Sequence, residues 1–202
     1  MQSFEEGSYE RAYNHFKEVP MNKKWVRMYT SYYMALSLAR MGKTSEAIQQ
    51  FEKIANNTSS KFFIEARYKI SEAYERRKEY QKAIQNYKKL ENSTVLDENS
   101  RQRAMYNIQH CYFLMGKLKK AETGLKDLIS KVSSKDLKKD IELLIIRILL
   151  ENKDYRRAEA SLDKLAGEYS GATITNGYGD IYFAKRNYKE ARQKYLRTTI
   201  LF

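Results

Sequence analysis

The stretch GYGDIYFAKRNYKEARQKY, residues 177–195, places small residues and tyrosines at intervals typical of packed helices. The residues that set this pattern are Gly179, Tyr182, Tyr188, Ala191 and Tyr195. Residues that recur every three or four positions share one face of an α-helix. The pattern breaks near Asn187, which predicts a short turn between two helices.

The same arrangement recurs along the chain when segments are aligned on a central alanine. The segments are GSYERAYNHF (7–16), GKTSEAIQQF (42–51), KEYQKAIQNY (78–87), GKLKKAETGL (116–125), KDYRRAEASL (153–162) and RNYKEARQKY (186–195). Their alanines are Ala12, Ala47, Ala83, Ala121, Ala158 and Ala191, separated by 35, 36, 38, 37 and 33 residues. Self-similarity at such a period predicts a repeat protein in which each unit is one pair of helices.

Each aligned segment has the periodicity of an amphipathic helix. In residues 78–90, a single apolar stripe is formed by Tyr80, Ala83, Ile84, Tyr87 and Leu90. We expect the alanine to lie where two helix backbones approach, because a leucine there would overpack the contact at a cost of roughly 1–3 kcal/mol. The turns between paired helices are expected near Gly42, Gly116 and Asn187.

The composition also favours an all-helical protein. One proline and eight glycines in 202 residues are few for a protein built from strands and turns. Cys111 is the only cysteine, so no internal disulfide is formed. The most apolar run, IELLIIRILL at 141–150, is far shorter than the roughly 20 residues that cross a bilayer.

These segments resemble the tetratricopeptide repeat family, and residues 177–195 match its pattern best. The resemblance covers nearly the whole chain and implies an all-α fold, a right-handed α-solenoid of antiparallel helix pairs. Two departures stand out: the family's terminal proline appears only as Pro20, and the units average about 36 residues instead of 34. Longer units resemble those of bacterial cell-envelope assembly proteins, which favours the periplasm or cell envelope over the cytoplasm.

The resemblance predicts one solenoid over residues 1–202, and we expect it to be a fragment of a longer protein. A half-unit at 1–20 precedes units at about 24–55, 61–92, 99–131, 136–168 and 171–202. The chain ends with apolar Ile200, Leu201 and Phe202, whereas solenoid ends normally carry a polar outer face. This end therefore predicts either a piece cut from a longer protein or an end covered by another subunit.

In proteins of this family, ligands usually lie against an inner wall made by the first helix of each unit. The positions that correspond to this wall hold Tyr32, Leu36, Arg40, Tyr68, Glu72, Arg76, Tyr106, His110, Arg147, Asn176 and Asp180. Tyrosine and arginine are over-represented among interface hot spots, which favours a groove that binds a partner peptide or helix. The three tyrosines fit ordinary half-buried packing as well, and that alternative stays open.

Nothing in the sequence points to catalysis, a metal or a cofactor. His15 and His110 are the only histidines, which excludes a histidine-based metal cluster. His110 and Cys111 are adjacent in sequence and so lie about 100° apart around a helix, whereas a nucleophile and its base face each other. We therefore expect no enzyme and no cofactor.

The net charge of +13 fits either an anionic partner or solvated helix faces from a lysine-rich proteome. The best interpretation is a protein–protein interaction scaffold whose positive charge steers an acidic protein or peptide. The alternative is a basic solenoid that binds RNA or a membrane surface. Nucleic acid is disfavoured because the basic clusters at 76–78, 117–120 and 138–139 lie on several rims, where a phosphate-tracking site needs one continuous face. A membrane role is expected only through a partner or a missing anchor.

Overall fold

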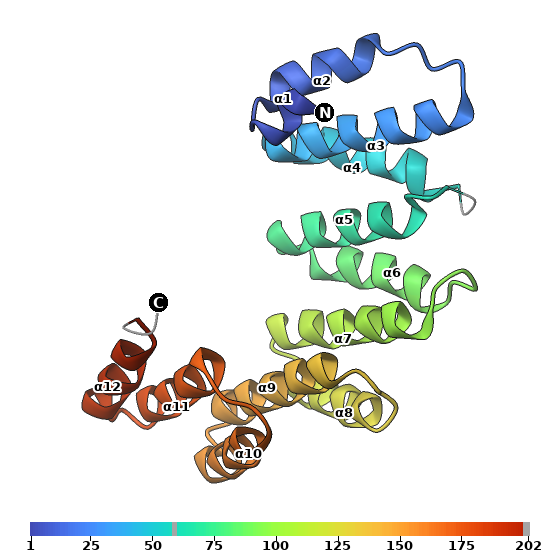
Figure 1. Ribbon diagram of the computed structural model, residues 1–202. Helices are drawn as coiled ribbons and strands as arrows, with labels where there is room; N and C mark the ends of the chain where they lie inside the picture. Colours follow the sequence, from blue (N-terminus) through green and yellow to red (C-terminus); the bar gives the residue numbers. More distant parts are fainter. Residues whose placement is uncertain (58–59, 200–202) are drawn as a thin grey trace. The chain divides into compact units, whose positions relative to one another are not determined.

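The computed structural model describes residues 1–57 and 60–199, and in these residues the chain forms helices and no strands (Figure 1). The predicted all-α repeat fold is confirmed. The helices are α1 (Gln2–Glu5), α2 (Tyr9–Glu18), α3 (Lys24–Arg40), α4 (Thr44–Ala55), α5 (Phe63–Arg76), α6 (Tyr80–Glu91), α7 (Glu98–Leu114), α8 (Leu118–Ile129), α9 (Lys135–Glu151), α10 (Tyr155–Glu168), α11 (Ala172–Ala184) and α12 (Tyr188–Thr199).

A three-residue turn joins the two helices of every pair, and each turn has a left-handed residue at its centre. These central residues are Gly7, Gly42, Lys78, Gly116, Lys153 and Arg186, with φ between 59° and 79°. The next amide closes a six-residue loop onto the first helix, as where Lys43 N–H donates to the Leu38 carbonyl at 2.9 Å. This is the Schellman geometry that ends a helix and satisfies its last carbonyls.

The alanines that define the repeat are buried as predicted. Ala12, Ala47, Ala83, Ala121, Ala158 and Ala191 are each at most 3% exposed. The opening stretch shows a second close approach, because a Cβ on Gly179 would lie 2.6 Å from the Tyr195 ring. Real Cβ atoms essentially never approach other atoms this closely, so any larger residue at position 179 would force the Tyr195 ring to move.

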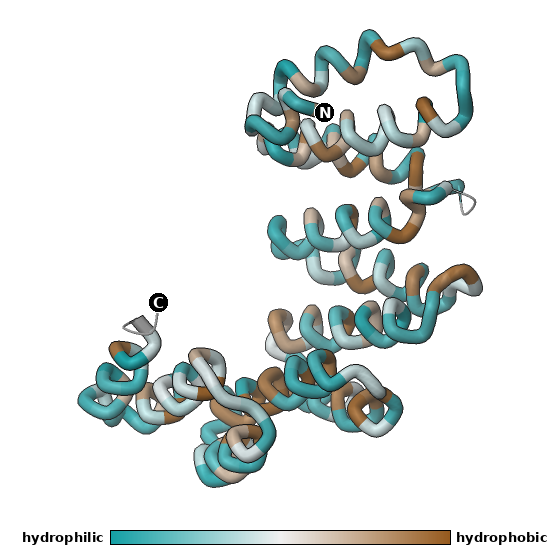
Figure 2. Tube along the Cα trace, viewed as in Figure 1, coloured by the Kyte–Doolittle hydropathy of each residue, from teal (hydrophilic) through white to brown (hydrophobic). Residues whose placement is uncertain are grey.

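The chain divides into two compact units, Met1–Cys111 (unit 1) and Tyr112–Phe202 (unit 2). In unit 1, α3 packs on α4, α4 on α5 and α5 on α6, around a core that includes Leu38, Phe51 and Ile70. In unit 2, α9 packs on α10, α10 on α11 and α11 on α12, around a core that includes Ile146, Leu162 and Ile181. Figure 2 shows hydrophobic and hydrophilic positions alternating along the helices, as amphipathic packing requires.

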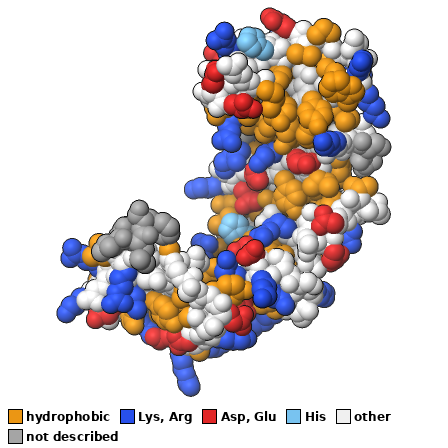
Figure 3. Space-filling view, in the orientation of Figure 1, with side chains coloured by type: hydrophobic (Ala, Val, Ile, Leu, Met, Phe, Trp, Pro, Cys, Tyr) orange, Lys and Arg blue, Asp and Glu red, His pale blue; other side chains and the backbone are white. Residues whose placement is uncertain are grey.

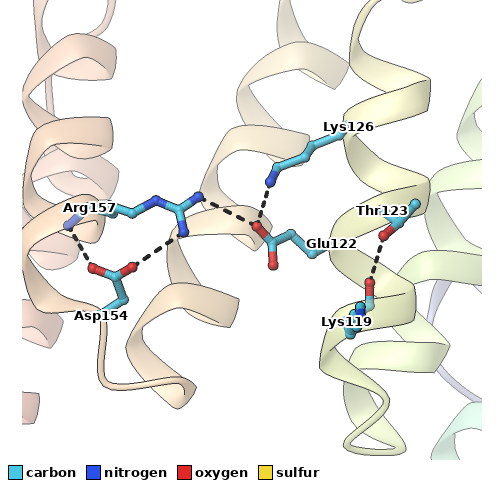
Figure 4. Close-up of polar contacts among 6 residues, drawn as sticks. All are labelled: Lys119, Glu122, Thr123, Lys126, Asp154 and Arg157. Atoms are coloured by element: carbon cyan, nitrogen blue, oxygen red, sulfur yellow. Dashed lines mark hydrogen bonds and ion pairs between the residues drawn. The ribbon is translucent and has the colours of Figure 1, made fainter.

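Charged side chains link the second helices of unit 2 on their solvent side (Figure 4). Glu122 on α8 lies 2.7 Å from Lys126 Nζ and 3.6 Å from the Arg157 guanidinium on α10. Arg157 also pairs with Asp154 at 3.3 Å. Lys126 and Arg157 are more than half exposed, so each pair stabilises the fold by about 1 kcal/mol or less.

No helix in residues 1–57 and 60–199 combines the length and the apolar character needed to cross a membrane. The apolar end predicted as a subunit contact, Ile200, Leu201 and Phe202, lies outside the described residues.

Candidate partner-binding face

The predicted wall residues lie on the first helices of their pairs, and the two units hold them separately. Unit 1 carries Tyr32, Leu36, Arg40, Tyr68, Glu72, Arg76, Tyr106 and His110 on α3, α5 and α7. Unit 2 carries Arg147, Asn176 and Asp180 on α9 and α11. We call the unit 1 set the first-helix face.

Tyr32 is part of the core beneath this face. Its side chain is 9% exposed, and its ring stacks on Phe62 with centroids 4.2 Å apart and an interplanar angle of 7°. It also meets Phe51 edge to face at 5.9 Å. Burial, together with the nearby Glu65 carboxylate, raises the pKa of Tyr32 to about 12. Tyr32 therefore supports the face from below, and Leu36 packs partly buried against the same core.

Tyr68 is half-buried and connects α5 to the first turn of α7. Its hydroxyl donates to the Ser100 carbonyl at 2.8 Å, and its ring meets the Tyr87 ring edge to face at 5.9 Å. Burial raises the pKa of Tyr68 to about 12. The hydroxyl thus holds two successive helix pairs together, and the half-buried ring is part of the face.

A stacked row of side chains follows α7. The Arg103 guanidinium lies 5.7 Å from the centre of the Tyr106 ring, and Tyr106 stacks on His110 with centroids 6.4 Å apart and planes 9° from parallel. The three residues are half-buried. Stacked flat rings with a cation above them form a rigid apolar surface with polar edges, which suits contact with a partner side chain.

Glu75 is the residue at this face that the sequence analysis missed. Its Oε1 accepts a hydrogen bond from the Tyr87 hydroxyl at 2.6 Å, and its Oε2 lies 3.5 Å from His110 Nδ1. The buried Cys111 thiol also interacts with this carboxylate electrostatically. Burial and this carboxylate raise the pKa of Cys111 to about 12 and that of Tyr87 further still. One signal was available, because a buried tyrosine hydroxyl needs an acceptor nearby.

At the first-helix face, the carboxylates have partners within the protein, whereas two arginines have no ion pair with the described residues. Glu72 pairs with Lys69 at 2.9 Å on its own helix, and Glu75 is held by Tyr87 and His110. Arg40 and Arg76, the last residues of α3 and α5, are exposed and form no ion pair with the described residues. The net charge that this face presents to a partner is therefore positive at its turn end.

The unit 2 residues make local contacts. The Arg147 guanidinium lies 4.9 Å from the centre of the Phe113 ring. Asn176 Oδ1 accepts from Thr198 Oγ1 at 3.0 Å, and Asp180 Oδ1 accepts from the Tyr195 hydroxyl at 2.6 Å. Asn176 and Asp180 thus tie α11 to α12, and Arg147 is the exposed cation of the three.

The described residues hold no cluster of three or more His, Cys, Asp or Glu side chains that could bind a metal ion. Cys111 is fully buried, and its raised pKa keeps the thiol protonated at neutral pH. The side chains gathered at the first-helix face can therefore stack, donate hydrogen bonds and attract anions.

Family comparisons agree with this geometry. The family described as tetratricopeptide repeat matches residues 29–57 and 65–93, and the tetratricopeptide repeat-like domain matches residues 102–199. No curated protein matches the chain in sequence.

Three solved structures of similar fold are compared with the chain. BtubC (BKLC) from P. vanneervenii has a TM-score of 0.66 at 12% identity, covering 95% of this chain and 87% of that chain. The TPR-like repeats of a putative kinesin light chain from Podosopora anserina have a TM-score of 0.64 at 12% identity, covering 86% and 93%. MamA, from residue 41 to its end, from Desulfovibrio magneticus RS-1 has a TM-score of 0.59 at 20% identity, covering 82% and 88%.

Both family matches fall on the stacked helix pairs, which carry the buried alanines and the left-handed turns described above. The chain belongs to the tetratricopeptide repeat family, whose members typically act as non-enzymatic scaffolds for protein–protein interaction.

Proposed function

We propose that the protein is an interaction scaffold whose first-helix face in unit 1 binds an acidic segment of a partner protein. The observation that carries this proposal is the pair Arg40 and Arg76. They occupy the same position in successive helix pairs, two residues before the left-handed turn residue, and both are exposed. A partner with carboxylates at a matching spacing would pair with both side chains at once.

The remaining residues of the face supply packing for such a segment. Leu36 and the stacked ring of Tyr106 are partly exposed apolar surface between the arginines and the helix starts. Their backing by Tyr32 and by the Glu75 contacts fixes their positions before a partner arrives, which lowers the entropic cost of binding. Direct pairing with Arg40 and Arg76 then makes association sensitive to salt.

The alternative of an RNA-binding solenoid receives less support. On the face drawn in Figure 3, Lys and Arg side chains are interspersed with Asp and Glu and with hydrophobic residues. A surface that tracks a phosphate backbone needs an uninterrupted basic stripe.

The proposal is tested with purified protein and a random peptide library rich in Asp and Glu. Selected peptides are measured by calorimetry on the starting chain, on Arg40→Ala with Arg76→Ala, and on Tyr106→Ala. We expect each variant to weaken binding at least fivefold, since both contacts lie in the proposed interface. Lys53→Ala with Lys88→Ala is the matched control, because it removes the same charge from exposed positions on the second helices α4 and α6.

Equal losses in the control and the arginine variant would refute a specific face and leave only general charge attraction. Single-stranded oligouridine serves as the competing ligand in the same titration. If it binds more tightly than every selected peptide and loses affinity steeply between 50 and 200 mM salt, the RNA alternative replaces the proposal.

A further inference from the structure

In unit 2, α12 and the end of α11 carry an apolar hollow. The hollow has a volume of about 350 Å³ and is lined by Phe183, Tyr188, Ala191, Arg192, Tyr195 and Leu196. Phe183 is 59% exposed, Tyr188 is 58% exposed and Leu196 is 47% exposed. Large apolar side chains gathered at this exposure mark an interaction surface more often than scattered single residues do.

The preceding pair shows what normally covers this side of a second helix. On α10, Glu159 forms an ion pair with Lys185, the residue directly after α11, and Asp163 accepts a hydrogen bond from the Tyr178 hydroxyl of α11 at 2.6 Å. Between these contacts, Leu162 packs against Gly177, where a Cβ would lie 3.0 Å from the leucine methyl groups. Thus α11 and the residue that follows it cover α10 through Gly177, Tyr178 and Lys185.

The hollow on α12 uses the same three positions. Glu159, Leu162 and Asp163 are the sixth, ninth and tenth residues after the left-handed turn residue Lys153. The corresponding residues after Arg186 are Arg192, Tyr195 and Leu196, and all three line the hollow. The hollow is therefore the surface on which a further helix fits as α11 fits on α10.

At two of these positions the residue type in the last pair differs from that in the other pairs. The difference indicates what kind of helix the hollow would bind. The tenth position is charged and exposed in the five other pairs, where it holds Lys17, Glu52, Lys88, Lys126 and Asp163. Only in the last pair is it apolar, as Leu196. The sixth position holds Tyr13, Ile48, Ile84, Glu122 and Glu159 in the other pairs, and only in the last pair is it a cation, Arg192.

We propose that this face binds an acidic amphipathic helix of a partner protein in the register that α11 takes on α10. An apolar side chain of the partner contacts Leu196. It takes the place that Tyr178 has on α10, where Tyr178 contacts Asp163. Seven residues further along the partner helix, a carboxylate pairs with Arg192. This ion pair corresponds to Lys185 with Glu159, with the positive and negative charges exchanged between the two helices.

The charge of α12 supports an acidic partner over a second copy of this chain. The helix carries Lys189, Arg192, Lys194 and Arg197 against the single carboxylate of Glu190. Two copies joined through this face would bring these cations together, and like charges in a close interface oppose association. An acidic helix meets the same cations with opposite charge. The inference does not rest on the proposed function of the first-helix face.

The test uses a stapled, fluorescein-labelled peptide that copies residues 172–187 with Tyr178→Leu and Lys185→Glu. A matched peptide keeps Lys185 and differs in that residue alone. Anisotropy titrations with the full chain are expected to show at least fivefold tighter binding of the glutamate peptide. Arg192→Glu in the protein is expected to reverse this preference, whereas Lys189→Glu, the same charge change outside the hollow, is expected to preserve it.

Leu196→Lys provides a second variant that keeps the fold intact, because lysine stands at this position in three other pairs. We expect it to weaken the glutamate peptide at least fivefold with an unchanged melting temperature. Equal binding of both peptides, or no binding at 200 μM, would overturn the proposal.

Two further measurements address other occupants of the hollow. Vesicles containing 30% anionic lipid are tested by co-sedimentation, and the mass of the chain is measured by light scattering. If Leu196→Lys abolishes vesicle binding or dissociates a dimer while the peptide does not compete, the face binds a membrane or a second copy and the proposal fails. Absence of both, together with the preference reversal, supports it.

Discussion

Gly179 of α11 lies directly beneath the ring of Tyr195 of α12, since a Cβ on the glycine would approach the ring to 2.6 Å. The other pairs balance the same two positions by size. At the equivalent positions, nine residues after and seven before the turn residue, aromatic Phe51 and Tyr87 go with the small residues Ala35 and Ser71, and Leu162 goes with the larger Ile146. In these pairs the bulkier residue on the second helix thus goes with the smaller residue on the first, as close packing requires.

Gly179→Ala is therefore expected to destabilise unit 2 by about 1–3 kcal/mol, because the ring of Tyr195 must leave its position. Chemical denaturation monitored by circular dichroism measures this loss. Gly167→Ala on α10 is the control, since no atom lies within 4 Å of the place its Cβ would take and alanine is the better helix former.

Because Gly179 and Tyr195 share one packing site, a smaller residue at position 195 should offset a larger one at position 179. Tyr195→Leu should recover part of the Gly179→Ala loss, so that the double variant is less destabilised than the sum of the single variants. Strict additivity would show that the two residues do not share one packing site.

Glu75→Ala is expected to destabilise unit 1 by about 1–3 kcal/mol, because it leaves the buried Tyr87 hydroxyl without its acceptor. Glu72→Ala, three residues earlier on α5, removes a partly exposed ion pair and should cost about 1 kcal/mol or less. Urea denaturation of both variants gives the comparison. Tyr87→Phe in the Glu75→Ala background should restore stability, and a lack of recovery would assign the loss to another contact.

The left-handed turn residues predict opposite effects for two substitutions. Gly42→Ala is expected to destabilise by about 1–2 kcal/mol, because an L-residue is strained at a φ of 76°. Lys153→Gly removes the same strain at a φ of 60° and should raise the melting temperature. Thermal denaturation of both variants decides the matter, and a melting temperature that falls for Lys153→Gly would contradict it.

Alkaline pH is expected to weaken unit 1 through Tyr68. Burial raises its pKa from 10.0 to about 12 in the folded chain, so the stabilisation is complete below pH 10 and is lost as pH rises through 12. Melting temperatures measured from pH 9 to pH 12 should fall more steeply for the starting chain than for Tyr68→Phe. Parallel curves would show that ionisation of Tyr68 is not linked to unfolding.

Much of the fold was readable from the sequence because its determinants are local. A buried alanine at each crossing and an apolar stripe of period 3.6 leave a record in every unit, and the structure confirms both. The left-handed turn was visible at Gly42 and Gly116 but not at Lys78, Lys153 or Arg186. Those three positions hold lysine or arginine, which do not signal a left-handed conformation in the sequence. The neighbouring helices impose that conformation.

The candidate site was less readable because burial depends on neighbours that are distant in sequence. Tyr32 and Tyr106 occupy equivalent positions, yet Tyr32 is covered by Phe62 from the connection before α5. Glu75 was missed since its partners, Tyr87, His110 and Cys111, come from two other helices. The apolar character of Leu196 was present in the sequence, but its meaning depends on how α11 covers α10.

The uniform three-residue turns have a consequence for how this chain accepts change. Since every turn within a pair has the same length, the differences between repeats fall on the helices and on the connections between pairs, which range from three residues at 169–171 to seven at 56–62. Foreign sequence, such as an epitope or a protease site, should be tolerated in these connections and rejected at Gly42 or Gly116. The turns within pairs thus keep the spacing of the helices constant, whereas the connections between pairs can accept insertions during evolution.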